Sequence, residues 1–154
     1  TNENIRIDVK TTSQKNRSHL FSYEQCNPPH GTFSVIVSLF VEQINTGTSL
    51  RDIISHIEKR LRDDLELILK LHEIVAITLG KGLNDGLSKC FDLRLAESSL
   101  QIFNSLDIPA IRGEIPKGVS DIHFRSELSQ IKALTKGEII EKEPMMLDFL
   151  SRDI

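Results

Sequence analysis

The chain has 154 residues, of which 39% are hydrophobic, which is enough to bury one sizeable core but not two independent cores of usual size. Its formal net charge of −3, from 19 basic and 22 acidic residues, excludes a globally basic nucleic-acid-binding protein. Two widely separated cysteines match no zinc spacing or disulfide framework, and no apolar run is long enough for a membrane span, so we expect a reduced, cytoplasmic environment.

A β-strand is predicted near the amino end, where apolar and polar side chains alternate from residue 5 to residue 12. Successive strand side chains point to opposite faces, so Asp8 and Lys10 share one face. Ile7 and Val9 lie on the other face, which we expect to pack against an apolar layer. The first 32 residues carry four basic and three acidic side chains, a net charge of +1, so a DNA-facing surface is expected near this end.

A carboxylate and a lysine side by side on a rigid strand suit phosphodiester hydrolysis. Asp8 can hold a divalent cation, the Val9 carbonyl can supply a second ligand, and the Lys10 ammonium can stabilise charge on the phosphate or on its attacking water. An acid-x-lysine tripeptide arises by chance about once in a chain of this length. The same pair therefore also has a plainer interpretation, as a surface ion pair on an edge strand.

The next segments predict a loop, a short turn and a buried strand. Residues 13–18 are polar and predict a loop, followed by a short segment at 19–21 and a helical turn that Ser22 caps. Residues 27–31 contain two prolines and a glycine and break regular structure. The run 32–41 is rich in β-branched and aromatic side chains, which predicts a strand covered on both faces.

The middle of the chain predicts helices. Ser49 begins a capping-box pattern, and apolar side chains recur at helical spacing over residues 50–61, which predicts an amphipathic helix. A second helix is predicted from about 64 to 79, where a glycine ends it. Residues 84–86 predict a turn, and residues 87–96 a short helix.

The carboxyl third changes character. Alternating apolar residues predict strands at 98–103 and 120–128, although a helix over 121–136 competes with the second strand. A helix is predicted at 132–141 and is interrupted by a proline. Residues 145–150 then form either a last helical turn or a docking tail.

Several separated blocks of this sequence resemble the PD-(D/E)xK nuclease superfamily, in particular one bacterial branch of it. Together the blocks cover most of the chain. They are residues 7–12, 19–25 with Pro28 and Pro29, 47–52, Ser99 and Leu100 with Phe103, Ile108 and Pro109, and 118–125.

The resemblance implies an α/β (α+β) fold, a restriction-endonuclease-like mixed central sheet flanked by helices and missing its amino-terminal elements. The whole chain, 1–154, would be the carboxyl-terminal portion of a single nuclease domain. Its active-site strands would lie within 1–45, its helical part within 49–96, and its late strands and terminal helix within 98–154.

The resemblance also implies roles for single residues. Asp8 would be the second acidic metal ligand, Lys10 the catalytic lysine, and Gln25 a residue that orients substrate or water. His19 and Ser22 are weaker candidates for substrate binding. For Gln25 and Ser22, helix capping and backbone bonding is an equally good interpretation.

Three basic residues are candidates for contacts with backbone phosphates, namely Lys15, Arg17 and Arg125, with a solvated surface as the favoured alternative. The superfamily's first acidic ligand should lie upstream of the opening strand, so this portion alone is expected to bind metal weakly and to cleave nothing. Asp8 stands where the branch more often has glutamate, an exchange that shortens the reach by one methylene.

The implied activity is that of a DNA endonuclease of restriction or defence type, with Mg2+ or Mn2+ as cofactor. DNA is the expected partner, other subunits of a restriction or defence system are compatible with it, and so is a homo-oligomer. Two alternatives stay open at this point. One is a nuclease-fold module that has lost catalysis and serves DNA binding or subunit assembly. The other is an unrelated helical interaction domain.

Overall fold

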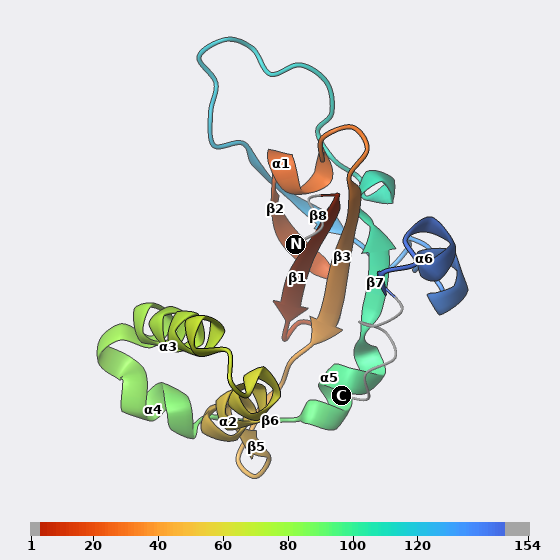
Figure 1. The fold of residues 1–154 in the computed structure, drawn as a ribbon. Coiled ribbons are helices and arrows are strands. Elements are labelled where there is room, and N and C mark those ends of the chain that lie inside the picture. Colours follow the sequence, from red (N-terminus) through yellow and green to blue (C-terminus); the bar gives the residue numbers. More distant parts are fainter. Residues whose placement is uncertain (1–3, 147–154) are drawn as a thin grey trace. The chain divides into compact units, whose positions relative to one another are not determined.

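The computed structural model describes residues 4–146. Its contacts divide the chain into two compact units, Thr1–Phe40 with Glu97–Ile154, and Val41–Ala96. Figure 1 labels most helices and strands of both units. None of the helices in residues 4–146 is both long and apolar enough to cross a membrane.

The first unit is built on a mixed sheet, as the sequence predicts. β1 (Ile5–Thr12) pairs in parallel with β3 (Phe33–Phe40), and β3 pairs antiparallel with β7 (Gln101–Asn104), giving the order β1-β3-β7. The parallel register places Asp8 opposite Ile36 and Lys10 opposite Ser38. The side chains of Asp8 and Lys10 therefore lie on the face of the sheet that also carries Ile36 and Ser38.

A second, two-stranded antiparallel sheet joins β2 (Ser18–Ser22) to β8 (His123–Glu127). The four-residue helix α1 (Tyr23–Cys26) follows β2 directly, with Ser22 as its N-cap residue, as predicted. Before β2, residues 13–17 form the expected loop. This arrangement places β2 and α1 next to the strand that carries Asp8 and Lys10 (Figure 1).

β3 is buried on both faces, which confirms the prediction for the apolar run. On one face, Ile36 belongs to a fully buried cluster with Phe21 of β2 and Phe103 of β7. On the other face, Val35 and Val37 belong to a second cluster, whose further members are Ile102, Ile139 and Met146. Because apolar side chains pack against both faces of β3, this strand gives β1 a rigid pairing partner.

The exposed residues of β1 correct one expectation. The prediction packs Ile7 and Val9 against an apolar layer, but their side chains are 37% and 61% exposed. Among the apolar residues of this strand, Ile5 does pack against the second cluster. The side chains of Asp8 and Lys10 are half-buried instead, because their face is the one covered by β2 and α1.

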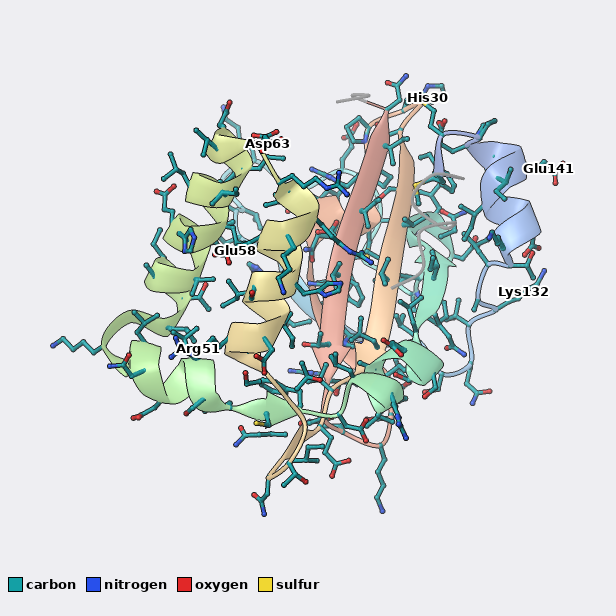
Figure 2. The ribbon with its side chains drawn as sticks, turned by 60° about the horizontal axis from the view of Figure 1, so that its bottom comes forward. His30, Arg51, Glu58, Asp63, Lys132 and Glu141 are labelled. Atoms are coloured by element: carbon teal, nitrogen blue, oxygen red, sulfur yellow. The ribbon has the colours of Figure 1, made fainter. Side chains whose placement is uncertain are left out.

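The carboxyl-terminal helix α6 (Lys136–Lys142) is shorter than the predicted 132–141. Thr135 caps it: its hydroxyl accepts a hydrogen bond from the Glu138 amide, and the Glu138 carboxylate reaches back to the Thr135 amide. This capping box sets the start of the helix four residues later than predicted. Lys132, beside α6 in Figure 2, donates to the same carboxylate at 2.6 Å. Of the predicted tail 145–150, residues 147–150 lie outside the described residues.

The second unit holds the predicted helices and a small sheet. Ser49 caps α2 (Leu50–Leu61), Asp64 caps α3 (Leu65–Leu79), and both helices match their predictions. Asp63 lies at the junction between them (Figure 2). The remaining elements are β4 (Gln43–Ile44), β5 (Thr48–Ser49), β6 (Cys90–Phe91), the 3-10 turn η1 (Gly80–Gly82) and α4 (Leu83–Ser88), with β6 between β4 and β5 in the sheet.

Three local predictions are wrong. Residues 84–86 are part of α4 and not a turn, because Gly86 is buried against Leu79 and a Cβ there would lie 2.8 Å from a Leu79 methyl carbon. The predicted helix 87–96 is interrupted by β6 and resumes as α5 (Leu93–Ser99). The predicted strand 98–103 therefore begins later, at β7, and 3-10 turn η2 (Ser105–Asp107) follows it.

Candidate active site

Asp8, Lys10 and Gln25 form one hydrogen-bonded group. Lys10 Nζ donates to Gln25 Oε1 at 2.9 Å, and Gln25 Nε2 donates to Asp8 Oδ1 at 3.1 Å. The amide oxygen of Gln25 thus accepts from the ammonium, and its amide nitrogen donates to the carboxylate. Only one orientation of the amide allows both hydrogen bonds. The structure brings together the three residues that the sequence proposes as catalytic.

The local sequence explains why Gln25 reaches this position. β2 ends at Ser22, whose amide donates to Gln25 Oε1 at 3.0 Å as the first turn of α1 begins. This is the backward half of a capping box, so the predicted capping role of Gln25 is present. The same oxygen also accepts from Lys10, so Gln25 caps the helix and contacts the site at once.

Lys10 is held by more than its amide partner. Its Nζ donates to the carbonyl oxygen of Leu20 at 2.8 Å and lies 5.1 Å from the ring centroid of Phe21. A cation at this distance from an aromatic face is attracted to the ring. Neither contact is predictable from the sequence, because a backbone carbonyl and a core phenylalanine of β2 carry no pattern that ties them to a lysine on the preceding strand.

Burial dominates the electrostatics of Lys10. Its pKa lies below the ordinary value of 10.5, first because burial disfavours the charged ammonium, while Asp8 acts in the opposite direction and favours the charge. Desolvation therefore outweighs the neighbouring carboxylate. The ammonium of Lys10 gives up its proton more readily than a lysine in water does.

Asp8 keeps one oxygen without a partner. Its Oδ2 is buried and accepts no hydrogen bond from any described residue, whereas Oδ1 accepts from Gln25. A buried carboxylate oxygen with no donor is costly unless a ligand or cation satisfies it. Its chemistry fits a hard divalent cation such as Mg2+, which prefers carboxylate and carbonyl oxygens.

The other ligands for such a cation are not gathered here. Within residues 4–146, no group of three or more His, Cys, Asp or Glu side chains is arranged to hold a metal. Cys26 lies close to Lys10 and Asp8, but burial raises the pKa of its thiol to about 11, so the thiol stays protonated at neutral pH. Asp8 therefore belongs to no such group in the described part of the chain.

Arg17 and His19 are buried beside the site, at 6% and 4% exposure. Arg17 donates to the carbonyl and hydroxyl oxygens of Ser38, both at 2.9 Å, and to the Ser99 carbonyl, and His19 Nε2 lies 2.8 Å from the Ser38 hydroxyl. The expectation of a solvated Arg17 is wrong. Burial, and then the charges of Lys10 and Arg17, lower the pKa of His19, so His19 is neutral at pH 7.

Replacing Arg17 by methionine is expected to lower the free energy of unfolding by about 2–4 kcal/mol, because the buried oxygens of Ser38 and the partly buried carbonyl of Ser99 would lose their donor. Urea unfolding measures this. Lys15→Met, in the same loop but at an exposed position, should change the value by less than about 0.5 kcal/mol. Equal effects of the two substitutions would contradict the structural role of Arg17.

The remaining candidates lie at the surface or at the helix cap. Lys15 is exposed in the loop before β2, and Arg125 is exposed on β8, paired with Leu20 across the two strands. Ser22 is the N-cap of α1. Of these, Ser22 contacts the site directly, since its amide donates to the Gln25 oxygen that also accepts from Lys10. Arg125 pairs with Leu20, whose carbonyl accepts from Lys10. Phosphate binding by these residues stays a prediction.

A family model described as "Putative PD-(D/E)XK family member" matches residues 1–129, a stretch that includes every candidate-site residue named above. No curated protein and no solved structure matches the chain.

Proposed function

Because the chain belongs to the PD-(D/E)XK family, we propose that it is a metal-dependent DNA endonuclease domain of restriction or defence type, which hydrolyses phosphodiester bonds. The observation that carries this proposal is the arrangement of Asp8, Lys10 and Gln25. One amide holds the carboxylate and the ammonium together and leaves Asp8 Oδ2 without a partner.

Asp8 and the Val9 carbonyl would hold a divalent cation, Mg2+ or Mn2+. When bound, such a cation polarises the scissile phosphate and lowers the pKa of a coordinated water. Asp8 would be one carboxylate of the set, and a further acidic ligand is needed to complete it, since no three His, Cys, Asp or Glu side chains among the described residues are arranged to hold a metal. This portion by itself is therefore expected to be inactive.

The positive charge of Lys10 would stabilise the negative charge that develops on the phosphate during the reaction. Because Lys10 lies two residues beyond Asp8 on the same face of β1, its ammonium would lie beside the phosphate that Asp8 would address. The lowered pKa also suits proton transfer with the attacking water. Gln25 holds both groups in register and can orient that water through its amide.

Duplex DNA is the proposed substrate. Lys15 and Arg125, both exposed, are the side chains best placed to meet its backbone phosphates. Arg17 is not proposed for this role, because its guanidinium is buried on Ser38 and Ser99. Other subunits of a restriction or defence system, or a second copy of the protein, would supply recognition and translocation in a cytoplasmic setting.

The complete protein that contains this chain is expected to cleave duplex DNA in the presence of Mg2+ or Mn2+, and to stop when EDTA removes the metal. Gel analysis of plasmid and linear substrates checks this, with RNA as a parallel substrate. Binding of DNA without cleavage under all metal conditions would overturn the enzymatic proposal. It would instead favour the alternative, a catalytically inactive nuclease-fold module for DNA binding or subunit assembly.

A further inference from the structure

Four backbone carbonyls converge on one arginine outside the site. Arg112 donates through one guanidinium nitrogen to the carbonyl of Cys26, the last residue of α1. Its other terminal nitrogen donates to the carbonyls of Ser105, Leu106 and Ile108, at 3.2, 2.8 and 2.9 Å. Arg112 thus joins the end of α1 to the segment that begins at η2.

The segment that begins at η2 is fixed in place by burial. Ile108 is buried in the same cluster as Phe21 and Cys26, and the Ser105 side chain is also buried. Arg112 itself is exposed, so the guanidinium does not line the site and its removal leaves no cavity in the core. Arg112 thus links the backbone at the end of α1 to the backbone of the segment that begins at η2.

α1 needs hydrogen bonds from outside the helix to keep its position. A helix of four residues has too few internal hydrogen bonds to hold its own geometry, so external contacts must fix it. Gln25 is the residue next to Cys26 and must keep its amide aligned with Asp8 on one side and Lys10 on the other. A small rotation of α1 would break one of these two bonds.

We infer that Arg112 is a positioning residue for Gln25, acting through the Cys26 carbonyl at the end of α1. The planar guanidinium is suited to this task, because it offers five N–H donors on three nitrogens in a fixed fork, whereas an ammonium offers its donors from one nitrogen on a flexible stem. This inference deepens the proposed function and rests on it, since Gln25 matters for cleavage only if this site cleaves.

The first test reads the Gln25 amide without any activity. In 15N-labelled protein, the side-chain NH2 signals of Gln25, assigned by their loss in Gln25→Ala, should shift toward those of a free glutamine in Arg112→Lys and Arg112→Ala. The backbone signals of β1 and β3 should remain in place. Arg112→Lys keeps the positive charge, so a shift of the Gln25 signals in this variant would result from the loss of the guanidinium hydrogen bonds.

Tyr23→Phe is the matched control, because it removes another hydrogen bond of α1, from the Tyr23 hydroxyl to the Gly113 carbonyl, and leaves Cys26 untouched. Its Gln25 signals should stay at their wild-type positions. Unchanged Gln25 signals in both Arg112 variants, or an equal shift in Tyr23→Phe, would overturn the inference. Either result can be obtained whether or not the protein cleaves DNA.

The second test is a double-mutant cycle in the cleavage assay. Arg112→Lys should slow cleavage by about 10-fold to 100-fold, the usual cost of a small misplacement at an active site. In a Gln25→Ala background the same substitution should change the rate by less than about twofold, because the two residues act as one unit. Additive losses would show that Arg112 acts by another route.

Discussion

Lys10→Met is expected to abolish metal-dependent DNA cleavage while leaving the free energy of unfolding at pH 7 equal to or above that of the wild type. Loss of the ammonium removes charge stabilisation at the phosphate, so cleavage should fall by at least about 100-fold. Stability should not fall, because burial lowers the pKa of Lys10 despite the nearby carboxylate of Asp8. The folded state therefore disfavours the charge that catalysis needs.

The pH dependence of this stability difference has a defined sign. The pKa of Lys10 is lower in the folded chain than its value of 10.5 in the unfolded chain, so the unfolded state binds more protons between the two values. The cost of burying the charge is fully present below the folded pKa and declines as the pH rises from the folded pKa to 10.5. The advantage of Lys10→Met should therefore be greatest near neutral pH and smallest above pH 10.5.

Urea unfolding at several pH values and a cleavage assay at neutral pH measure both parts. Lys59→Met, at an exposed position on α2, is the control and should alter neither quantity appreciably. Cleavage that survives in Lys10→Met would remove Lys10 from the catalytic group. A large loss of stability in Lys10→Met would instead make its contacts with Leu20 and Gln25 structural.

The part of the site that the sequence predicts is the part encoded by local spacing. Asp8 and Lys10 share a face because they are two residues apart on a strand, and the strand itself follows from alternation. Gln25 is three residues after a serine cap, which is also a local pattern. Local spacing therefore predicts these three residues, whereas the hydrogen bonds that join them depend on how β1 and α1 come together in the fold.

The contacts that sequence could not predict are long-range and involve backbone. Arg112 binds carbonyl groups, which every residue has, so no side-chain pattern marks its partners. Arg17 is charged and lies in a polar loop, which predicts that its side chain is exposed. The side chain is instead buried, where it donates hydrogen bonds to Ser38 and Ser99. Ile7 and Val9 alternate as a buried face should, but alternation shows which side chains share a face and not which face is covered.

Asp8→Asn is expected to remove both the cation dependence of stability and the cleavage. The substitution keeps the size of the side chain and lets one oxygen still accept from Gln25, but it takes away the charge that a divalent cation needs. Losing several kcal/mol of electrostatic stabilisation corresponds to a rate reduced by roughly 10^3-fold. The wild-type complete protein should gain about 2.7 kcal/mol of stability at a Mn2+ concentration 100 times the dissociation constant, and Asp8→Asn should gain little.

Thermal or urea unfolding across a Mn2+ titration checks the binding part independently of catalysis. Asp63→Asn, at the junction of α2 and α3, is the control and should respond to Mn2+ as the wild type does (Figure 2). If Mn2+ stabilises Asp8→Asn as strongly as the wild type, the cation binds elsewhere and the unpartnered Oδ2 has another cause. If binding is lost but cleavage persists, the metal at Asp8 is not the one used in the reaction, and the role assigned to this carboxylate is wrong.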